Sequence, residues 1–172
     1  MNITRKVIGT TIGMALFGSL MLTPYAAHAA TAKVLTTVEA QHIIANAERL
    51  QGKVQYHWGV YDTSKMWFDC SSFTKYLYKK EGINLRWGAR KQYVDGIKIS
   101  KSQLRAGDLV FFSVPSTANR TTKYDRIQHV GIYIGNGKFI HNLSPKYDVT
   151  ISNLNVGYWK NHYVAAARVK AN

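Results

Sequence analysis

Two apolar segments that alternate with other residues, 127–134 and 138–143, flank the turn Gly135-Asn136-Gly137. Gly and Asn tolerate the left-handed backbone that tight turns require, so this pattern predicts an antiparallel β-hairpin. From Gly88 onward the rest of the chain is predicted as strands and loops: strands at 109–112 and within 158–169, and a polar loop at 113–126.

The length of the hairpin loop decides where two histidines point. A two-residue loop would place His141 on the same face as Val130, Ile132 and Ile134. A three-residue loop places Gly131 opposite His141, so that the residues of one face are His129, Tyr133, Phe139 and His141. A shift of one residue reverses every side chain, so the apolar pattern favours the three-residue loop. In that register the two histidines are diagonal neighbours, about 7–8 Å apart between backbones.

The first half of the chain predicts two helices. Residues 37–50 have a rough apolar face and end before Gly52. Residues 70–81 follow Asp69, a good N-cap, and end before Gly82. Helices followed by antiparallel strands predict an α+β domain.

Cys70 is the only cysteine of the chain, and it lies in the first turn of the second predicted helix. The free N–H groups and the dipole of a helix start stabilise a thiolate. A lone cysteine in an exported protein is either a reactive thiol or a buried, inert side chain. Both interpretations are open on this residue alone.

Residues 1–29 predict a secretory signal peptide. It has a basic start, an apolar run and a small-x-small cleavage site, which are Arg5 and Lys6, residues 7–22, and Ala27-His28-Ala29. The apolar run is shorter than the about 20 residues that span a bilayer. Cleavage after Ala29 would leave residues 30–172 as one domain, secreted or in the cell wall, with no stable membrane span.

The chain carries 23 Lys and Arg residues against nine Asp and Glu, a formal net charge of +14. Such a charge favours polyanionic surroundings. For an exported protein these are anionic cell-wall polymers or lipid headgroups, and export argues against nucleic acid. The alternative is that the charge only aids solubility.

A thiol-dependent hydrolase needs a thiol that ionises, a base and a group that orients the base. We expect Cys70 and His129 to form an ion pair, with the thiol pKa lowered from ~8.5 to roughly 3.5–7.5. His141 would hold the His129 ring in its useful tautomer, and the Cys70 N–H would stabilise an oxyanion. Histidines at metal-binding helical spacing are missing from the sequence, so we expect no metal site.

The segments around these residues resemble the NlpC-type, papain-like cell-wall peptidases. The matching segments are Tyr56-His57-Trp58-Gly59, Phe68-Asp69-Cys70-Ser71, residues 104–112, residues 129–135 and Phe139-Ile140-His141. The resemblance implies a papain-like fold, in which helices pack on an antiparallel sheet and the cysteine begins a helix. It also implies that Cys70 is the nucleophile, His129 the base and His141 the orienting residue, with no cofactor.

The resemblance further implies hydrolysis of peptidoglycan stem peptides, most often at the bond from γ-D-glutamate to the diamino acid. It places Tyr56, Asp69 and Ser71 around the substrate, although Asp69 is equally explained as a helix cap. Three Trp residues are candidates for the lining of a groove, namely Trp58, Trp67 and Trp87. At three positions where the family commonly has Gly, this chain has Val60, Trp67 and Ser72, which bears on the shape of the groove.

Three alternatives are open. The same Cys/His site could belong to an amidase that cuts between sugar and peptide, or to a lipid acyltransferase. The order of Cys70 before His129 counts against the acyltransferase. The third alternative is a cationic wall-binding protein without activity.

Overall fold

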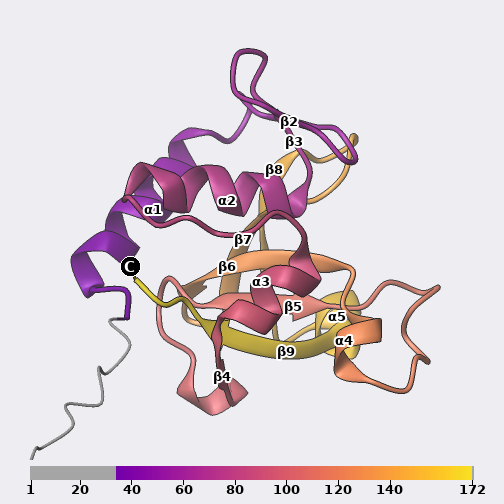
Figure 1. Cartoon of the computed structure of the whole chain (residues 1–172). Coiled ribbons are helices and arrows are strands. Elements are labelled where there is room, and N and C mark those ends of the chain that lie inside the picture. Colours follow the sequence, from indigo (N-terminus) through magenta and orange to yellow (C-terminus); the bar gives the residue numbers. More distant parts are fainter. Residues whose placement is uncertain (1–33, 172) are drawn as a thin grey trace, which may run out of the picture. The chain divides into compact units, whose positions relative to one another are not determined.

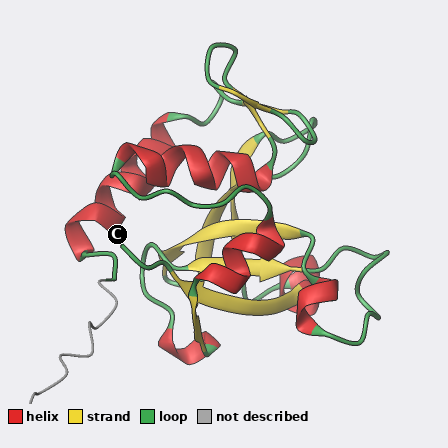
Figure 2. Cartoon of the chain, viewed as in Figure 1, coloured by secondary structure: helices red, strands yellow, loops and turns green. Residues whose placement is uncertain are grey.

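The computed structural model describes residues 34–171, and the predicted signal peptide, residues 1–29, lies outside the described residues. A six-stranded antiparallel sheet has the order β4-β9-β5-β6-β7-β8 (Figures 1 and 2). Its strands are β4 (Ile97–Ile99), β5 (Leu109–Phe112), β6 (His129–Gly135), β7 (Lys138–Asn142), β8 (Val149–Asn153) and β9 (Tyr163–Arg168). The predicted antiparallel sheet is confirmed.

Two helices, α1 (Thr37–Arg49) and α2 (Cys70–Lys80), form where the sequence predicts them, because each has a side-chain cap. The Thr36 hydroxyl accepts the Glu39 N–H, and the Glu39 carboxylate accepts the Thr36 N–H. Helix α2 packs against β6 and β7, and α1 packs against α2 (Figure 1). Together with the sheet they make the predicted α+β architecture. No helix among residues 34–171 is long and apolar enough to cross a bilayer.

The β6–β7 hairpin has the predicted register. Ile132 pairs with Ile140 and Tyr133 with Phe139, which leaves Gly131 opposite His141. At the tip, Gly135 pairs with Lys138 around a two-residue turn, and a bulge between Tyr133 and Gly135 restores the register expected of the three-residue loop. A Cβ at Gly131 would lie 2.6 Å from the Phe139 ring and 3.1 Å from the His141 Cβ, so only glycine fits there.

The two faces of the sheet carry separate apolar cores. The face toward α2 contains Leu109, Phe111, Val130, Ile132 and Ile140, which share one core with Phe73 and Leu77 of α2. The opposite face contains Val110, Phe112, Phe139, Leu154 and Ala166, with Trp159 and Tyr163 packed against them. The alternation along the hairpin therefore sends its branched aliphatic residues toward α2 and its two histidines toward the aromatic side.

A small sheet of strands β1 (Gln55–Tyr56), β3 (Trp67–Phe68) and β2 (Tyr61–Asp62), in that order, leads into α2. The Phe68 carbonyl accepts hydrogen bonds from the His57 N–H at 2.9 Å and the Asn142 side chain at 2.8 Å. This fixes the residues before Cys70 to the end of β7.

Beyond Gly88 the prediction of strands and loops alone was wrong, and the longest segment that it missed is helix α3 (Ala89–Asp95). Gly88 provides no side-chain cap, so the sequence does not mark the helix start. Tertiary contacts hold α3 instead: the Gln92 amide donates to the Ser71 carbonyl and accepts from the Thr74 hydroxyl. Other unpredicted elements are η1 (Lys101–Gln103), α4 (Lys123–Arg126) inside the predicted loop, α5 (Gly157–His162) and strand β8.

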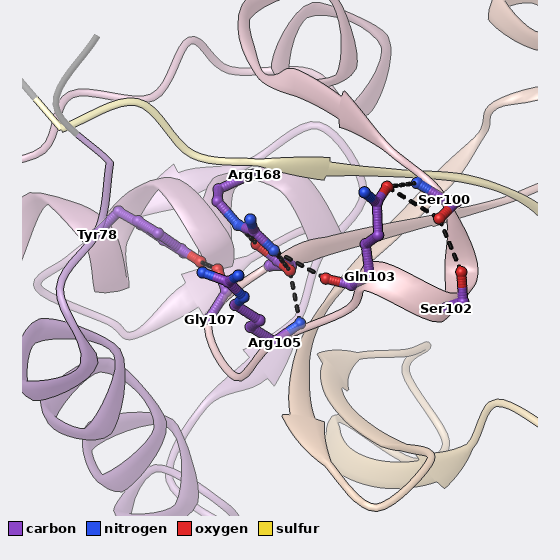
Figure 3. A network of polar contacts seen from close by, with 8 residues as sticks. Tyr78, Ser100, Ser102, Gln103, Arg105, Gly107 and Arg168 are labelled. Carbon is purple, nitrogen blue, oxygen red and sulfur yellow. Dashed lines mark hydrogen bonds and ion pairs between the residues drawn. The ribbon is translucent and has the colours of Figure 1, made fainter. Parts of the chain in front are cut away.

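A polar network joins α2, the turn before β5, and β9 (Figure 3). Arg168 donates to the Asp108 carboxylate from Nε and Nη2, both at 2.9 Å. The Arg105 N–H donates to the same carboxylate at 2.7 Å, and the Tyr78 hydroxyl donates to the Gly107 carbonyl. The network ties the end of β9 to the turn that starts β5 and to the helix that carries Cys70.

Candidate active site

Asp69 caps the helix that begins with Cys70 and accepts three side-chain or backbone hydrogen bonds. Its carboxylate accepts the Ser72 N–H at 2.7 Å, the Ser71 hydroxyl at 2.8 Å and the Trp87 indole N–H at 2.9 Å. The predicted cap is confirmed. The carboxylate is buried and directly precedes the thiol.

The Cys70 thiol lies between the start of α2 and the start of β6. The side chain is 4% exposed. The backbone N–H groups of Val130 and Ser71 lie near enough to the sulfur to lower the thiol pKa slightly, against the larger effect of burial. Because Val130 directly follows His129, this proximity brings the first residue of β6 next to the thiol.

The two histidines of the hairpin are hydrogen-bonded to each other. His129 Nε2 and His141 Nδ1 are 2.7 Å apart, and His141 Nε2 is 2.9 Å from the Ser152 hydroxyl on β8. The Trp159 ring from α5 lies against both imidazoles, with ring centroids 5.5 Å from His129 and 4.8 Å from His141. The predicted diagonal pair is confirmed as a direct contact, which leaves His129 Nδ1 as the ring nitrogen free to face a reacting group.

The charge state of the site differs from the sequence prediction. Burial, and then the Asp69 carboxylate, raise the pKa of the Cys70 thiol to about 12. Burial lowers the pKa of His129 to about 4, and burial together with His129 holds the pKa of His141 well below its ordinary value. These directions do not favour the expected ion pair in the resting site, because desolvation disfavours both the thiolate and the imidazolium. They favour a neutral thiol beside two neutral imidazoles.

This charge state predicts how Cys70 reacts with iodoacetamide. Since the thiolate is the nucleophile, the alkylation rate is expected to rise about tenfold per pH unit from pH 7 to pH 10 without levelling. Asp69→Asn removes the neighbouring negative charge and keeps a good N-cap, so its rate is expected to be higher at each pH. Mass spectrometry of timed samples measures the rate. A rate independent of pH between 5 and 9 would instead indicate a preformed thiolate.

Two hollows meet at the site. One, of about 430 Å³, is lined on the cysteine side by residues that include Cys70, Asp69, Ser71, Trp87 and Arg90. The other, of about 360 Å³, is lined on the histidine side by residues that include His129, Tyr56, Ser113, Leu143 and Tyr158. Trp58, which is 68% exposed, and Gln128 line both hollows. We call the two hollows together the groove, of which Cys70 lines one part and His129 the other.

The three predicted substrate residues lie along this groove. Asp69 and Ser71 line the cysteine side, and the Ser71 hydroxyl is bonded to Asp69. Tyr56 lines the histidine side, and its pKa is raised by burial and by the nearby Cys70 and Asp69. Of the three predicted Trp residues, Trp58 and Trp87 line the groove. Trp67 instead stacks on His57 with ring centroids 4.1 Å apart.

Val60 and Ser72, two of the three residues that stand where the resembling family commonly has Gly, contact each other. The Ser72 hydroxyl donates to the Val60 carbonyl at 2.7 Å and accepts the Asp69 N–H at 2.8 Å. Ser72 is fully buried, so this pair fixes the turn of the small sheet against the start of α2. These bonds need a hydroxyl at position 72.

Ser152 and Trp159 were not predicted as part of the site. Ser152 lies on the unpredicted strand β8, and Trp159 lies on helix α5, which has no side-chain cap. The alternation of residues 149–153 was the signal that could have indicated β8. Among residues 34–171, no three His, Cys, Asp or Glu side chains gather as a metal site would require.

Comparison with known proteins gives consistent similarities. A family model described as "NlpC/P60 family" matches residues 52–168. The chain is 40% identical over 129 residues to "Probable endopeptidase p60" of Listeria monocytogenes, covering 74% of this chain and 23% of that protein. It is 38% identical over 117 residues to "Murein DD-endopeptidase MepH" of Escherichia coli, covering 66% and 40%. It is 36% identical over 138 residues to "Gamma-DL-glutamyl hydrolase" of Bacillus subtilis, covering 79% and 30%.

The fold is also that of a solved structure. An NLP/P60-family protein of Staphylococcus aureus superposes with a TM-score of 0.68 at 30% identity, covering 83% of this chain and 45% of that chain. This likeness bears out the papain-like α+β prediction. The chain spans less than half the length of each of these curated relatives.

Proposed function

Because this chain belongs to the NlpC/P60 family, we propose that it is a cysteine peptidase that hydrolyses peptidoglycan stem peptides. The observation that carries the proposal is that the Cys70 thiol and His129 line two hollows that share Trp58 and Gln128, with His129 Nε2 2.7 Å from His141 Nδ1. The relatives named as endopeptidases or as a γ-DL-glutamyl hydrolase support the same reaction class.

In the proposed first step, Cys70 Sγ attacks the carbonyl carbon while its proton passes to His129 Nδ1. The neutral imidazole is suited to this transfer, because its lone pair is free in the resting state. The imidazolium that forms donates from Nε2 to His141 Nδ1, which spreads the new charge into a buried pair. The Cys70 N–H, a free donor at the start of α2, stabilises the oxyanion.

In the second step, the imidazolium returns its proton to the leaving amine, which departs and leaves a thioester on Cys70. Water then attacks the thioester, with His129 again accepting a proton, and the thiol is restored. One hollow lies on the cysteine side and the other on the histidine side, and we propose that each holds the peptide on one side of the scissile bond. This cycle needs no cofactor.

We place the cut at the bond from γ-D-glutamate to the diamino acid, with Tyr56, Asp69 and Ser71 as substrate contacts. The B. subtilis relative is named for γ-DL-glutamyl hydrolysis, whereas the E. coli relative is named a DD-endopeptidase. We further propose that residues 1–29 direct secretion and that the protein acts in the cell wall. The high positive charge, to which residues 1–29 contribute only Arg5 and Lys6, supports association with anionic wall polymers there.

Digestion of purified peptidoglycan, followed by mass spectrometry of the released fragments, tests the proposed bond. We expect stems that end in γ-D-glutamate, together with fragments that begin with the diamino acid. The matched blank is the same protein alkylated to completion with iodoacetamide, which can modify only one thiol because the chain has one Cys. The blank is expected to release nothing.

Other fragment patterns would revise the proposal in defined ways. Cuts at the sugar–peptide amide would make the protein an amidase that uses the same thiol. Cuts between two D-centres would assign the bond named in the E. coli relative. Equal release by the alkylated blank would contradict the cysteine mechanism, and no release at any pH would favour a wall-binding protein.

A further inference from the structure

Ser152 makes the last contact of a hydrogen-bonded chain that starts at His129. Ser152 pairs with Phe139 across β7 and β8, so its side chain lies on the same face as His141. The distances along the chain are 2.7 Å from His129 Nε2 to His141 Nδ1 and 2.9 Å from His141 Nε2 to the Ser152 hydroxyl. Each of these two hydrogen bonds requires one atom that donates and one that accepts.

Only two arrangements of protons satisfy both contacts when the imidazoles are neutral. In the first, His129 carries its proton on Nε2 and His141 on Nε2, and the Ser152 hydroxyl accepts. In the second, both protons are on Nδ1, and Ser152 donates. The first leaves the His129 Nδ1 lone pair free to accept the Cys70 proton, and the second fills that position with a proton.

We propose that Ser152 is a positioning residue that holds His141 as the Nε2–H tautomer and thereby keeps His129 Nδ1 free as the base. This inference rests on the proposed function of the same site. Ser152 contacts His141 and not the reacting atoms. It therefore acts on the His129 base only through the His141 imidazole.

Burial gives the Ser152 contact its importance. His141 is 0% exposed, and the rings of Phe139 and Trp159 lie 4.6 Å and 4.8 Å from its ring centroid. The ring contacts and hydrogen bonds of the His141 imidazole are with the Phe139 and Trp159 rings, His129 and the Ser152 hydroxyl. An Nε2–H without an acceptor in such surroundings loses the stabilisation of a buried hydrogen bond.

Removal of the hydroxyl is therefore expected to change the tautomer. With Ala at position 152, His141 Nε2 has no hydrogen-bond partner. A buried lone pair without a partner costs less free energy than a buried N–H without one, so the His141 proton moves to Nδ1. His141 then donates to His129 Nε2, and the His129 proton moves to Nδ1. The resting base is blocked, although the fold is unchanged.

The test is a long-range ¹⁵N–¹H NMR spectrum of the imidazole nitrogens in wild type, Ser152→Ala and Ser152→Thr. Wild type and Ser152→Thr are expected to show His129 and His141 protonated at Nε2, and Ser152→Ala is expected to show both at Nδ1. In steady-state hydrolysis, Ser152→Ala is expected to lower kcat about tenfold with KM unchanged, and Ser152→Thr to restore it.

Thr150→Ala is the matched control, because Thr150 is on the same face of β8 and pairs with His141 through the backbone. It is expected to keep the wild-type tautomers and kcat. Unchanged tautomers in Ser152→Ala would overturn the inference. A wild-type protein that hydrolyses nothing would overturn the proposed function instead, and the spectra would still decide the role of Ser152.

Discussion

Cys70→Ala is expected to lower the rate of stem-peptide cleavage by at least about 10⁴-fold while the protein stays folded. The reason is that the substitution removes the atom that forms the thioester and leaves the groove in place. The side chain is small and is held at a helix start by the Asp69 cap, so truncation to Ala leaves the surrounding packing nearly unchanged. Cleavage of a defined stem peptide, followed by chromatography, measures the loss.

A double variant shows whether Cys70 and His129 act as one unit. Since the base has no proton to accept once the thiol is gone, Cys70→Ala with His129→Ala is expected to be no slower than Cys70→Ala alone. His57→Ala is the control, because His57 stacks on Trp67 and lines neither hollow. If the rate loss of the double variant equals the product of the two single-variant losses, the two side chains act separately.

Asp108→Ala is expected to lower the free energy of unfolding by about 3 kcal/mol. The Asp108 and Arg168 side chains are 4% and 17% exposed, so the substitution removes the acceptor of the Arg105 N–H. It leaves the mostly buried Arg168 guanidinium with the Gln103 carbonyl in place of a carboxylate (Figure 3). For a domain of this size, the midpoint of thermal unfolding is expected to fall by about 6–12 °C. Urea unfolding followed by tryptophan fluorescence gives the free energy directly.

Asp95→Ala provides a control with the same kind of ion pair. Asp95 also accepts two hydrogen bonds from one guanidinium, that of Arg86, but these side chains are 42% and 55% exposed. Water replaces such contacts at little cost, so its unfolding curve is expected to overlay that of wild type. An equal loss in both variants would contradict the assignment of stability to burial of the Asp108 pair.

The sequence predicted best where one local rule decides the structure. The alternation of residues 127–134 sets both faces of the sheet, because a slip of one residue would bury the histidines among aliphatic side chains. The caps Thr36 and Asp69 satisfy N–H groups that no other residue can reach, so α1 and α2 start where the sequence indicates. The juxtaposition of His129 and His141 follows from the same pairing.

Features that depend on distant contacts were missed. Helix α3 is held by Gln92 reaching back to α2, which no local pattern records. The pKa of Cys70 was predicted in the wrong direction, because a helix start is visible in the sequence whereas the depth of burial is not. Ser152 joins the histidines only because β8 pairs with β7.

The groove and the reacting groups are built by different parts of the chain. Cys70, His129 and His141 stand on helix α2 and strands β6 and β7, whereas Trp58, Gln128 and half of the other groove residues stand on connecting segments. Connecting segments tolerate substitution and insertion better than packed elements do. Part of the groove wall can therefore change by substitution in the connecting segments while the packed elements that carry Cys70, His129 and His141 are kept.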